Sequence, residues 1–200
     1  MLLLLPLTFF GFFRTYIDLY PAFNQKIDVY IHIHAFMATS WIFLLIIQPL
    51  LIRYKKNSWH KLLGKLSYVL FPLLLLSFTP MMINSNGENL LQEIIFQLRD
   101  IFLLLIFYGT AVYNKKNIAK HMRFMIATSL VFLFPTTGRI FAIWFDFGHP
   151  YNSDLSYIII YAILGFLILM DLKNKKDAKP YVIAFLYFVL THATFILVNV

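Results

Sequence analysis

Cysteine is absent from this chain, and charged residues are scarce. The 200 residues contain no Cys, and only 13% are charged, against about a quarter in an average soluble domain. Without thiols the chain has no disulfides, no thiolate metal ligands and no cysteine nucleophile. A glycine-rich phosphate loop, a nucleophile elbow and an HExxH pair are also missing, so the chemistry that depends on those motifs has no support.

Apolar residues dominate what is present. They make up 60% of the chain and fall in blocks of about twenty, the length that crosses a hydrocarbon core of roughly 30 Å. Only helices and closed barrels satisfy their backbone hydrogen bonds in lipid. The sequence therefore predicts an all-α integral membrane protein, built as a seven-transmembrane-helix bundle.

We expect one transmembrane helical domain over residues 1–200. Polar turn formers separate the spans, as in Asn84–Gly87 and Gly148–Asn152. The predicted spans are residues 1–22, 30–52, 62–83, 94–113, 124–145, 155–172 and 181–200.

The first segment is the least regular of the seven. Arg14 and Asp18 interrupt it, but it lacks the basic n-region and the small-residue cleavage site of a signal peptide. We therefore predict a first helix that begins at the start of the chain, with Arg14 snorkelling or paired to Asp18.

Charge predicts the orientation. Basic residues gather in the second-to-third, fourth-to-fifth and sixth-to-seventh connections: Arg53, Lys55, Lys56, Lys61, Lys65, Lys115, Lys116, Lys120, Arg123, Lys173, Lys175, Lys176 and Lys179. The opposite connections carry Asp28, Glu88, Glu93, Asp146 and Asp154. The positive-inside rule then places the N-terminus inside and the C-terminus outside, in the cytoplasmic (inner) membrane of a cell.

The same basic connections predict the partners. They are short and lie close to the bilayer, so we expect membrane lipids with anionic headgroups on the inner face, and no nucleic acid. A membrane-protein partner or a homo-oligomer stays open.

The histidines fall at two depths. His34 and its neighbour His32 start a span near the outer surface, whereas His60 and His121 open spans at the inner surface, and His149 lies in an outer loop. His192 is about 17 Å above the inner boundary, at a rise of about 1.5 Å per residue. The sequence thus predicts an outer set of His34 with His192 and an inner set of His60 with His121.

Helical geometry selects one residue of the outer pair. Residues two apart point about 200° away from each other, so only one of His32 and His34 faces the protein interior. His34 shares a stripe with Ala38, Trp41, Leu45 and Gln48. A buried face tolerates a glutamine in a span, so we expect His34 to point inward.

Embedded charges are usually paired or functional. His121 and Arg139 are about five turns apart on one helical face. We expect Asp100 and Arg139 to form an ion pair, or Arg139 to hold an anionic group such as a carboxylate.

Two stretches carry a family resemblance. Residues 34–65 hold a histidine, a Gln-Pro step and an H-K-x-x-G-K turn, and residues 121–139 hold H-x-R-x-M-I followed by an arginine. In order and spacing they resemble an uncharacterised bacterial multi-pass membrane family with a domain of unknown function. The resemblance covers roughly residues 30 to 140 and implies a membrane-embedded fold, but no chemistry. The matching residues are His34, Gln48, His60, Lys61, Gly64, Lys65, His121, Arg123, Met125, Ile126 and Arg139.

The leading hypothesis is haem b and electron transfer. Histidines near both membrane surfaces on several helices are similar to those of transmembrane di-haem cytochromes, in which imidazoles clamp the iron. His34 and His192 would hold an outer haem with Arg139 at a propionate. His60 and His121 would hold an inner haem, with Lys61, Lys65 or Arg123 at its propionates. Gly64, one turn after His60, would let the flat macrocycle approach the backbone.

Three other interpretations stay open. One is an intramembrane zinc-dependent hydrolase with His34, His192 and Asp100 as ligands. Another is a non-enzymatic small-solute or proton carrier, or an accessory subunit of a membrane complex, with histidines that titrate near neutral pH. The third is structural: the inner histidines cap helix ends or touch lipid phosphates, and His192 is a core histidine near Thr191 or Thr194.

Overall fold

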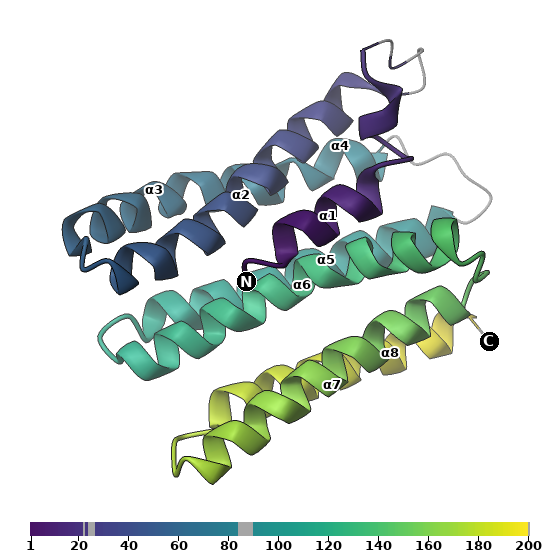
Figure 1. Ribbon diagram of the computed structural model, residues 1–200. Coiled ribbons are helices and arrows are strands. Elements are labelled where there is room, and N and C mark those ends of the chain that lie inside the picture. The colour runs from purple at the N-terminus through teal and green to yellow at the C-terminus, as the bar shows by residue number, and fades with distance from the viewer. Residues whose placement is uncertain (22, 24–26, 84–89, 200) are drawn as a thin grey trace. The chain divides into compact units, whose positions relative to one another are not determined.

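Figure 1 shows the helices of the computed structural model, which describes residues 1–21, 23, 27–83 and 90–199. All regular structure within those residues is helical. The predicted turn at Asn84–Gly87 and the acidic Glu88 lie outside the described residues. The helices are α1 (Leu4–Phe12), a 3-10 helix at Ile17–Leu19, α2 (Val29–Arg53), α3 (Asn57–Leu76), α4 (Phe78–Ile83), α5 (Leu90–Tyr113), α6 (Ile118–Trp144), α7 (Tyr151–Lys173) and α8 (Lys179–Asn199).

Six stretches of the described chain are long and apolar enough to cross a membrane. They coincide with the last six predicted spans, so the chain is an all-α, multi-pass membrane protein. α3 and α6 begin earlier than predicted, at Asn57 and Ile118, because a helix can extend beyond the apolar block that marks its span in the sequence. The six stretches are Val29–Arg53, Asn57–Ile83, Glu93–Tyr113, Ile118–Trp144, Tyr151–Lys173 and Lys179–Leu197.

The predicted first span over residues 1–22 is not a full span. Its helix, α1, has nine residues and is therefore about 14 Å long, less than half of a hydrocarbon core of roughly 30 Å. The alternative in which Arg14 pairs with Asp18 stays a prediction, since the two residues belong to different compact units of the chain. Within its own unit, the Arg14 guanidinium lies over the Trp144 ring, 4.4 Å from its centroid.

The chain divides into two compact units. Unit 1 contains residues 1–6 and 15–101, and unit 2 contains residues 7–14 and 102–200. α5 therefore gives its first half to unit 1 and its second half to unit 2. The prediction of one domain over residues 1–200 stays a prediction.

Unit 1 is built on the pair α2 and α3, with α4 packed against both. Its core contains Trp41, Leu45 and Leu74, each at most 1% exposed. α3 ends at Leu76 and α4 starts at Phe78. Pro80 explains this break, because its ring lacks an N–H and collides with the carbonyl four residues earlier, at Leu76.

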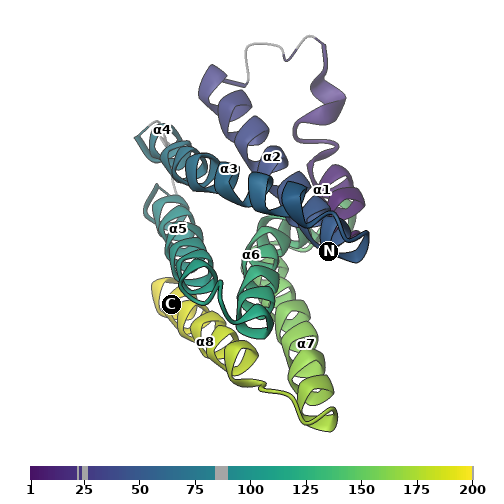
Figure 2. The same cartoon turned by 90° about the vertical axis from the view of Figure 1, so that its left-hand side faces the viewer.

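Unit 2 is built on α6, α7 and α8, and each of the three packs against the other two. Figure 2 shows the hairpin of α7 and α8. α1 lies against α6 at a glycine: a Cβ placed on Gly11 would stand 2.8 Å from the backbone oxygen of Thr136. The Trp144 indole also contacts α1, stacked on Phe10 at 4.3 Å between centroids.

Candidate functional site

His34 faces the protein interior of unit 1, at the break between α3 and α4. Its Nδ1 lies 2.9 Å from the Ser77 Oγ, and its ring meets Phe78 edge-on. The Ser77 hydroxyl donates its one proton to the Leu74 carbonyl at 2.6 Å. It must therefore accept from His34, so Nδ1 carries the proton and Nε2 is the nitrogen with the lone pair.

His32 points to a different set of residues, as the two-residue spacing predicts. Its Nδ1 lies 2.6 Å from the Tyr16 hydroxyl, and its ring packs against Phe23. Burial raises the pKa of the Tyr16 phenol above its ordinary value, so the phenol stays protonated and can donate to this nitrogen. His32 thus fastens the segment before α2 onto its first turn.

The predicted inward stripe of α2 is buried over most of its length. Trp41 is fully buried, Leu45 is 1% exposed and Gln48 is 8% exposed. The Gln48 Nε2 donates to the backbone oxygen of His60 at 3.2 Å. Gln48, in the last third of α2, therefore connects α2 to the first turn of α3, where His60 lies.

His60 and His121 occupy equivalent positions on two helices. Each is the fourth residue of its helix. Each backbone N–H donates to the residue before the helix, His60 to the Lys56 carbonyl and His121 to the Asn117 carbonyl. A basic connection precedes both, so the sequence places the two imidazoles at the same helical register.

The His121 ring has a fixed proton as well. Its Nδ1 lies 2.8 Å from the Ala111 carbonyl of α5, and a carbonyl only accepts. Nδ1 must therefore be protonated, which leaves Nε2 as the nitrogen with the lone pair. Histidine ligands of metals usually have this arrangement: one ring nitrogen binds the metal and the N–H of the other donates to an oxygen.

His192 has both ring nitrogens in hydrogen bonds. Nε2 lies 3.2 Å from Asp154 Oδ1 and Nδ1 lies 3.0 Å from the Tyr161 hydroxyl. The ring also stacks on Tyr157, with 4.0 Å between centroids. A carboxylate only accepts, so Nε2 carries a proton. The predicted neighbours Thr191 and Thr194 donate instead to backbone oxygens of their own helix.

Asp154 was expected in an outer connection, but it lies in the first turn of α7. Its side chain is 39% exposed, whereas that of His192 is 19% exposed. Tyr161 is about two turns further along α7, and its hydroxyl also lies 3.4 Å from the Phe188 carbonyl. Asp154, His192 and Tyr161 therefore form a hydrogen-bonded chain that leads from the surface of unit 2 into its interior.

The embedded charges have partners that the sequence did not suggest. Asp100 Oδ1 accepts from Arg99 Nη2 at 2.7 Å and from Arg99 Nε at 2.9 Å. The Arg139 Nη1 donates to the Pro135 carbonyl at 3.1 Å, and the guanidinium lies over Phe12 at 4.3 Å. The ion pair of Asp100 with Arg139 stays a prediction, since the two residues belong to different units.

A second ion pair, which we did not predict from the sequence, joins α6 to α7 at one end of unit 2. Arg123 Nε donates to Asp171 Oδ2 at 2.6 Å and Nη2 donates to Oδ1 at 2.8 Å. Nη1 donates to the Ala119 carbonyl. The Arg123 guanidinium therefore already binds a carboxylate. A haem propionate, which we predicted as its partner, would have to compete with Asp171. One acid and one arginine at the same end of two spans was the signal that could have revealed it.

Groups of three possible metal ligands are missing from the described residues: no three His, Asp or Glu side chains gather there. The zinc interpretation, which needs His34, His192 and Asp100 together, draws no support from this part of the chain.

No protein-family model, curated protein or solved structure matches this chain. The resemblance to the uncharacterised bacterial multi-pass family therefore stays a prediction.

Proposed function

We propose that this chain is a multi-pass protein of the cytoplasmic membrane that binds haem b through its histidines and takes part in electron transfer. One observation supports the proposal best: His34 and His121 each donate Nδ1–H to an oxygen. Iron is bound by an unprotonated ring nitrogen, and a fixed partner on the other nitrogen orients the ring and raises its basicity. Both imidazoles are prepared in this way by neighbours within their own unit.

The room beside His60 also fits. Among the described residues, a Cβ on Gly64 would meet only the Gln48 Nε2, at 4.0 Å. Gly64 lies one turn after His60, so the backbone there is open to a flat group. Lys61 and Lys65 are exposed on the same turn and could neutralise carboxylates.

His192 does not fit in the same way, because its Nε2 donates to Asp154. It could act as a ligand only after that hydrogen bond was broken. We therefore retain His34, His60 and His121 as ligands. Each predicted pair takes one histidine from each unit, so the pairing of His34 with His192 and of His60 with His121 rests on the sequence alone. Bound haem would supply reversible transfer of one electron.

The topology belongs to the same proposal. Six full spans, rather than seven, place the connections α2–α3, α5–α6 and α7–α8 on one side, and these hold most of the basic residues. The positive-inside rule then makes that side cytoplasmic and leaves the end of α8 outside. The start of α2 also lies outside in this arrangement, and α1 adds no crossing.

Visible spectra of the detergent-purified protein test the haem proposal. We expect absorbance bands that shift on reduction, and His34→Ala and His121→Ala should each remove one absorbing species and its share of extractable haem. His149→Ala, in a loop beside Phe195, is the matched control and should keep the full spectrum. Unchanged spectra in both ligand variants would remove the assignment.

The chain of Asp154, His192 and Tyr161 favours a second candidate, a proton pathway. A carboxylate, an imidazole and a phenol in hydrogen-bonded order can pass protons from the surface into a membrane. Asp154→Asn should slow proton flux into liposomes that contain the protein and a pH-sensitive dye. Asp146→Asn is the control, because Asp146 is exposed and has φ 56°, which asparagine also tolerates. Equal flux in all three proteins would exclude the pathway.

A further inference from the structure

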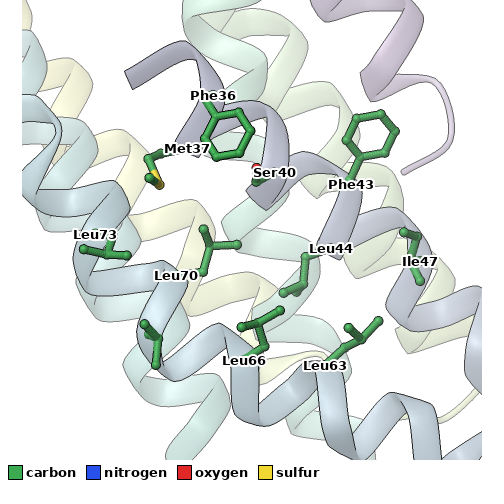
Figure 3. A pocket seen from close by; sticks show the side chains of 11 residues that line it. Phe36, Met37, Ser40, Phe43, Leu44, Ile47, Leu63, Leu66, Leu70 and Leu73 are labelled. Carbon is green, nitrogen blue, oxygen red and sulfur yellow. The ribbon is translucent and has the colours of Figure 1, made fainter. Parts of the chain in front are cut away.

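An apolar groove of about 380 Å³ runs between α2 and α3 in unit 1 (Figure 3). One wall is an i, i+3, i+4 stripe of α2 and the other a matching stripe of α3. Of the described residues that line the groove, Ser40 alone has a polar side chain. The lining residues are Phe36, Met37, Ser40, Phe43, Leu44, Ile47, Leu63, Leu66, Val69, Leu70 and Leu73.

The groove is open along its length. Phe36 is 67% exposed on one wall, and Leu66 and Val69 are 53% and 60% exposed on the other. Helical spacing continues the two stripes to Tyr54 and Trp59, at the connection between the helices. Both of these aromatic side chains are more than half exposed, which is typical of residues that lie at the level of lipid headgroups.

Positive charge surrounds this end of the groove. The connection itself is Tyr54, Lys55 and Lys56, and further basic residues lie on the adjoining turns. None of these side chains has an ion-pair partner among the described residues. The basic residues are Arg53, Lys55, Lys56, Lys61 and Lys65, all of them exposed.

We propose that the groove holds an acyl chain of an anionic glycerophospholipid, with its phosphate at Lys55 and Lys56. A peptide strand would leave its backbone N–H and C=O groups without partners against these apolar walls. A second copy in the same membrane orientation would bring two basic connections together, and like charges repel. An acyl chain needs no hydrogen bonds, and its phosphate matches the unneutralised lysines. The proposal is independent of haem binding.

Native mass spectrometry of the protein, released from micelles with equal phosphatidylglycerol and phosphatidylcholine, tests this site. The parent should retain one phosphatidylglycerol. Lys55→Gln with Lys56→Gln should weaken retention on the order of 30-fold, because two lysines near a membrane surface lose their attraction to the phosphate. Ser40→Phe, which fills the groove, should abolish it, whereas Ser40→Ala should not.

The α7–α8 connection offers a matched charge control. Lys175 has φ 54° and Lys55 has φ 57°, and Lys176 and Lys56 each donate a backbone N–H to the fifth residue before them, Asp171 and Leu51 respectively. Lys175→Gln with Lys176→Gln thus removes two charges from the same kind of turn and should leave retention close to the parent. Equal retention of both lipids, full retention by Ser40→Phe, or a dimer that Ser40→Phe dissociates would each overturn the proposal.

Discussion

Asp171→Asn should lower the free energy of unfolding by about 3–5 kcal/mol, the usual cost when one partner of a buried ion pair is removed. The Arg123 side chain is 4% exposed and that of Asp171 is 12% exposed. The pair joins α6 to α7, and the Tyr181 ring of α8 lies 5.8 Å from the guanidinium. Asparagine would leave the Arg123 charge buried without a counter-ion, at the point where the three helices of unit 2 meet.

Unfolding in mixed micelles with increasing SDS measures this loss. Asp177→Asn is the matched control: it removes the same charge six residues later, where Asp177 is exposed, accepts from the Lys179 N–H at the start of α8, and acts on Arg123 without a hydrogen bond to it. Asparagine caps as well as aspartate, so little change is expected. Arg123→Met with Asp171→Leu should recover most of the stability, because an apolar pair of similar volume needs no counter-ion. Equal losses in Asp171→Asn and Asp177→Asn would contradict the prediction.

Gly11→Val should detach α1 from α6. Even a Cβ at this position would lie 2.8 Å from the Thr136 oxygen and 3.1 Å from its Cγ2. A backbone carbonyl in the middle of α6 cannot retreat, so α1 must move. Overpacking of this kind costs about 1–3 kcal/mol, and α1 has few residues with which to offset it. The contacts at Phe10, Phe12 and Arg14 should be lost together.

Spin labels can report the detachment, since the chain has no cysteine of its own. Labels on Phe9→Cys and Phe145→Cys, both at exposed positions, should give one narrow distance in the parent and a broad, longer distribution with Gly11→Val. Gly165→Ala is the control, because the added Cβ meets no neighbouring atom of the described residues within 4 Å. A narrow, unchanged distance in the Gly11→Val protein would show that α1 stays in place.

The long spans could be predicted because lipid allows few alternatives. An apolar block such as Tyr30–Ile52 must be helical and must be about that length, and α2 confirms it. The prediction for the first segment failed because apolar composition does not reveal where a helix stops. α1 ends at Phe12, and turns follow. There Arg14 contacts Trp144, a residue far along the sequence.

The positions of the histidines on their helices were predictable, but their hydrogen-bond partners were less so. Periodicity placed His34 on the inward face, because one helix carries all the information needed. The partners of His192 could not be read in this way. They depend on how α7 rotates against α8, and a helix exposed to lipid has no polar face to indicate that rotation. Asp154 was assigned to a loop, although acidic residues are favourable in the first turn of a helix.

The hydroxyl of Ser77 takes part in both the bend and the site. It accepts from the imidazole of His34 and donates to Leu74 in the last turn before the bend. Because Pro80 fixes the residue at which that turn ends, moving the proline by one position would rotate Ser77 by about 100° and leave the imidazole without its acceptor. The position of the break between α3 and α4 therefore determines which nitrogen of His34 carries the proton. A sequence in which the break is moved needs another acceptor for the His34 Nδ1–H.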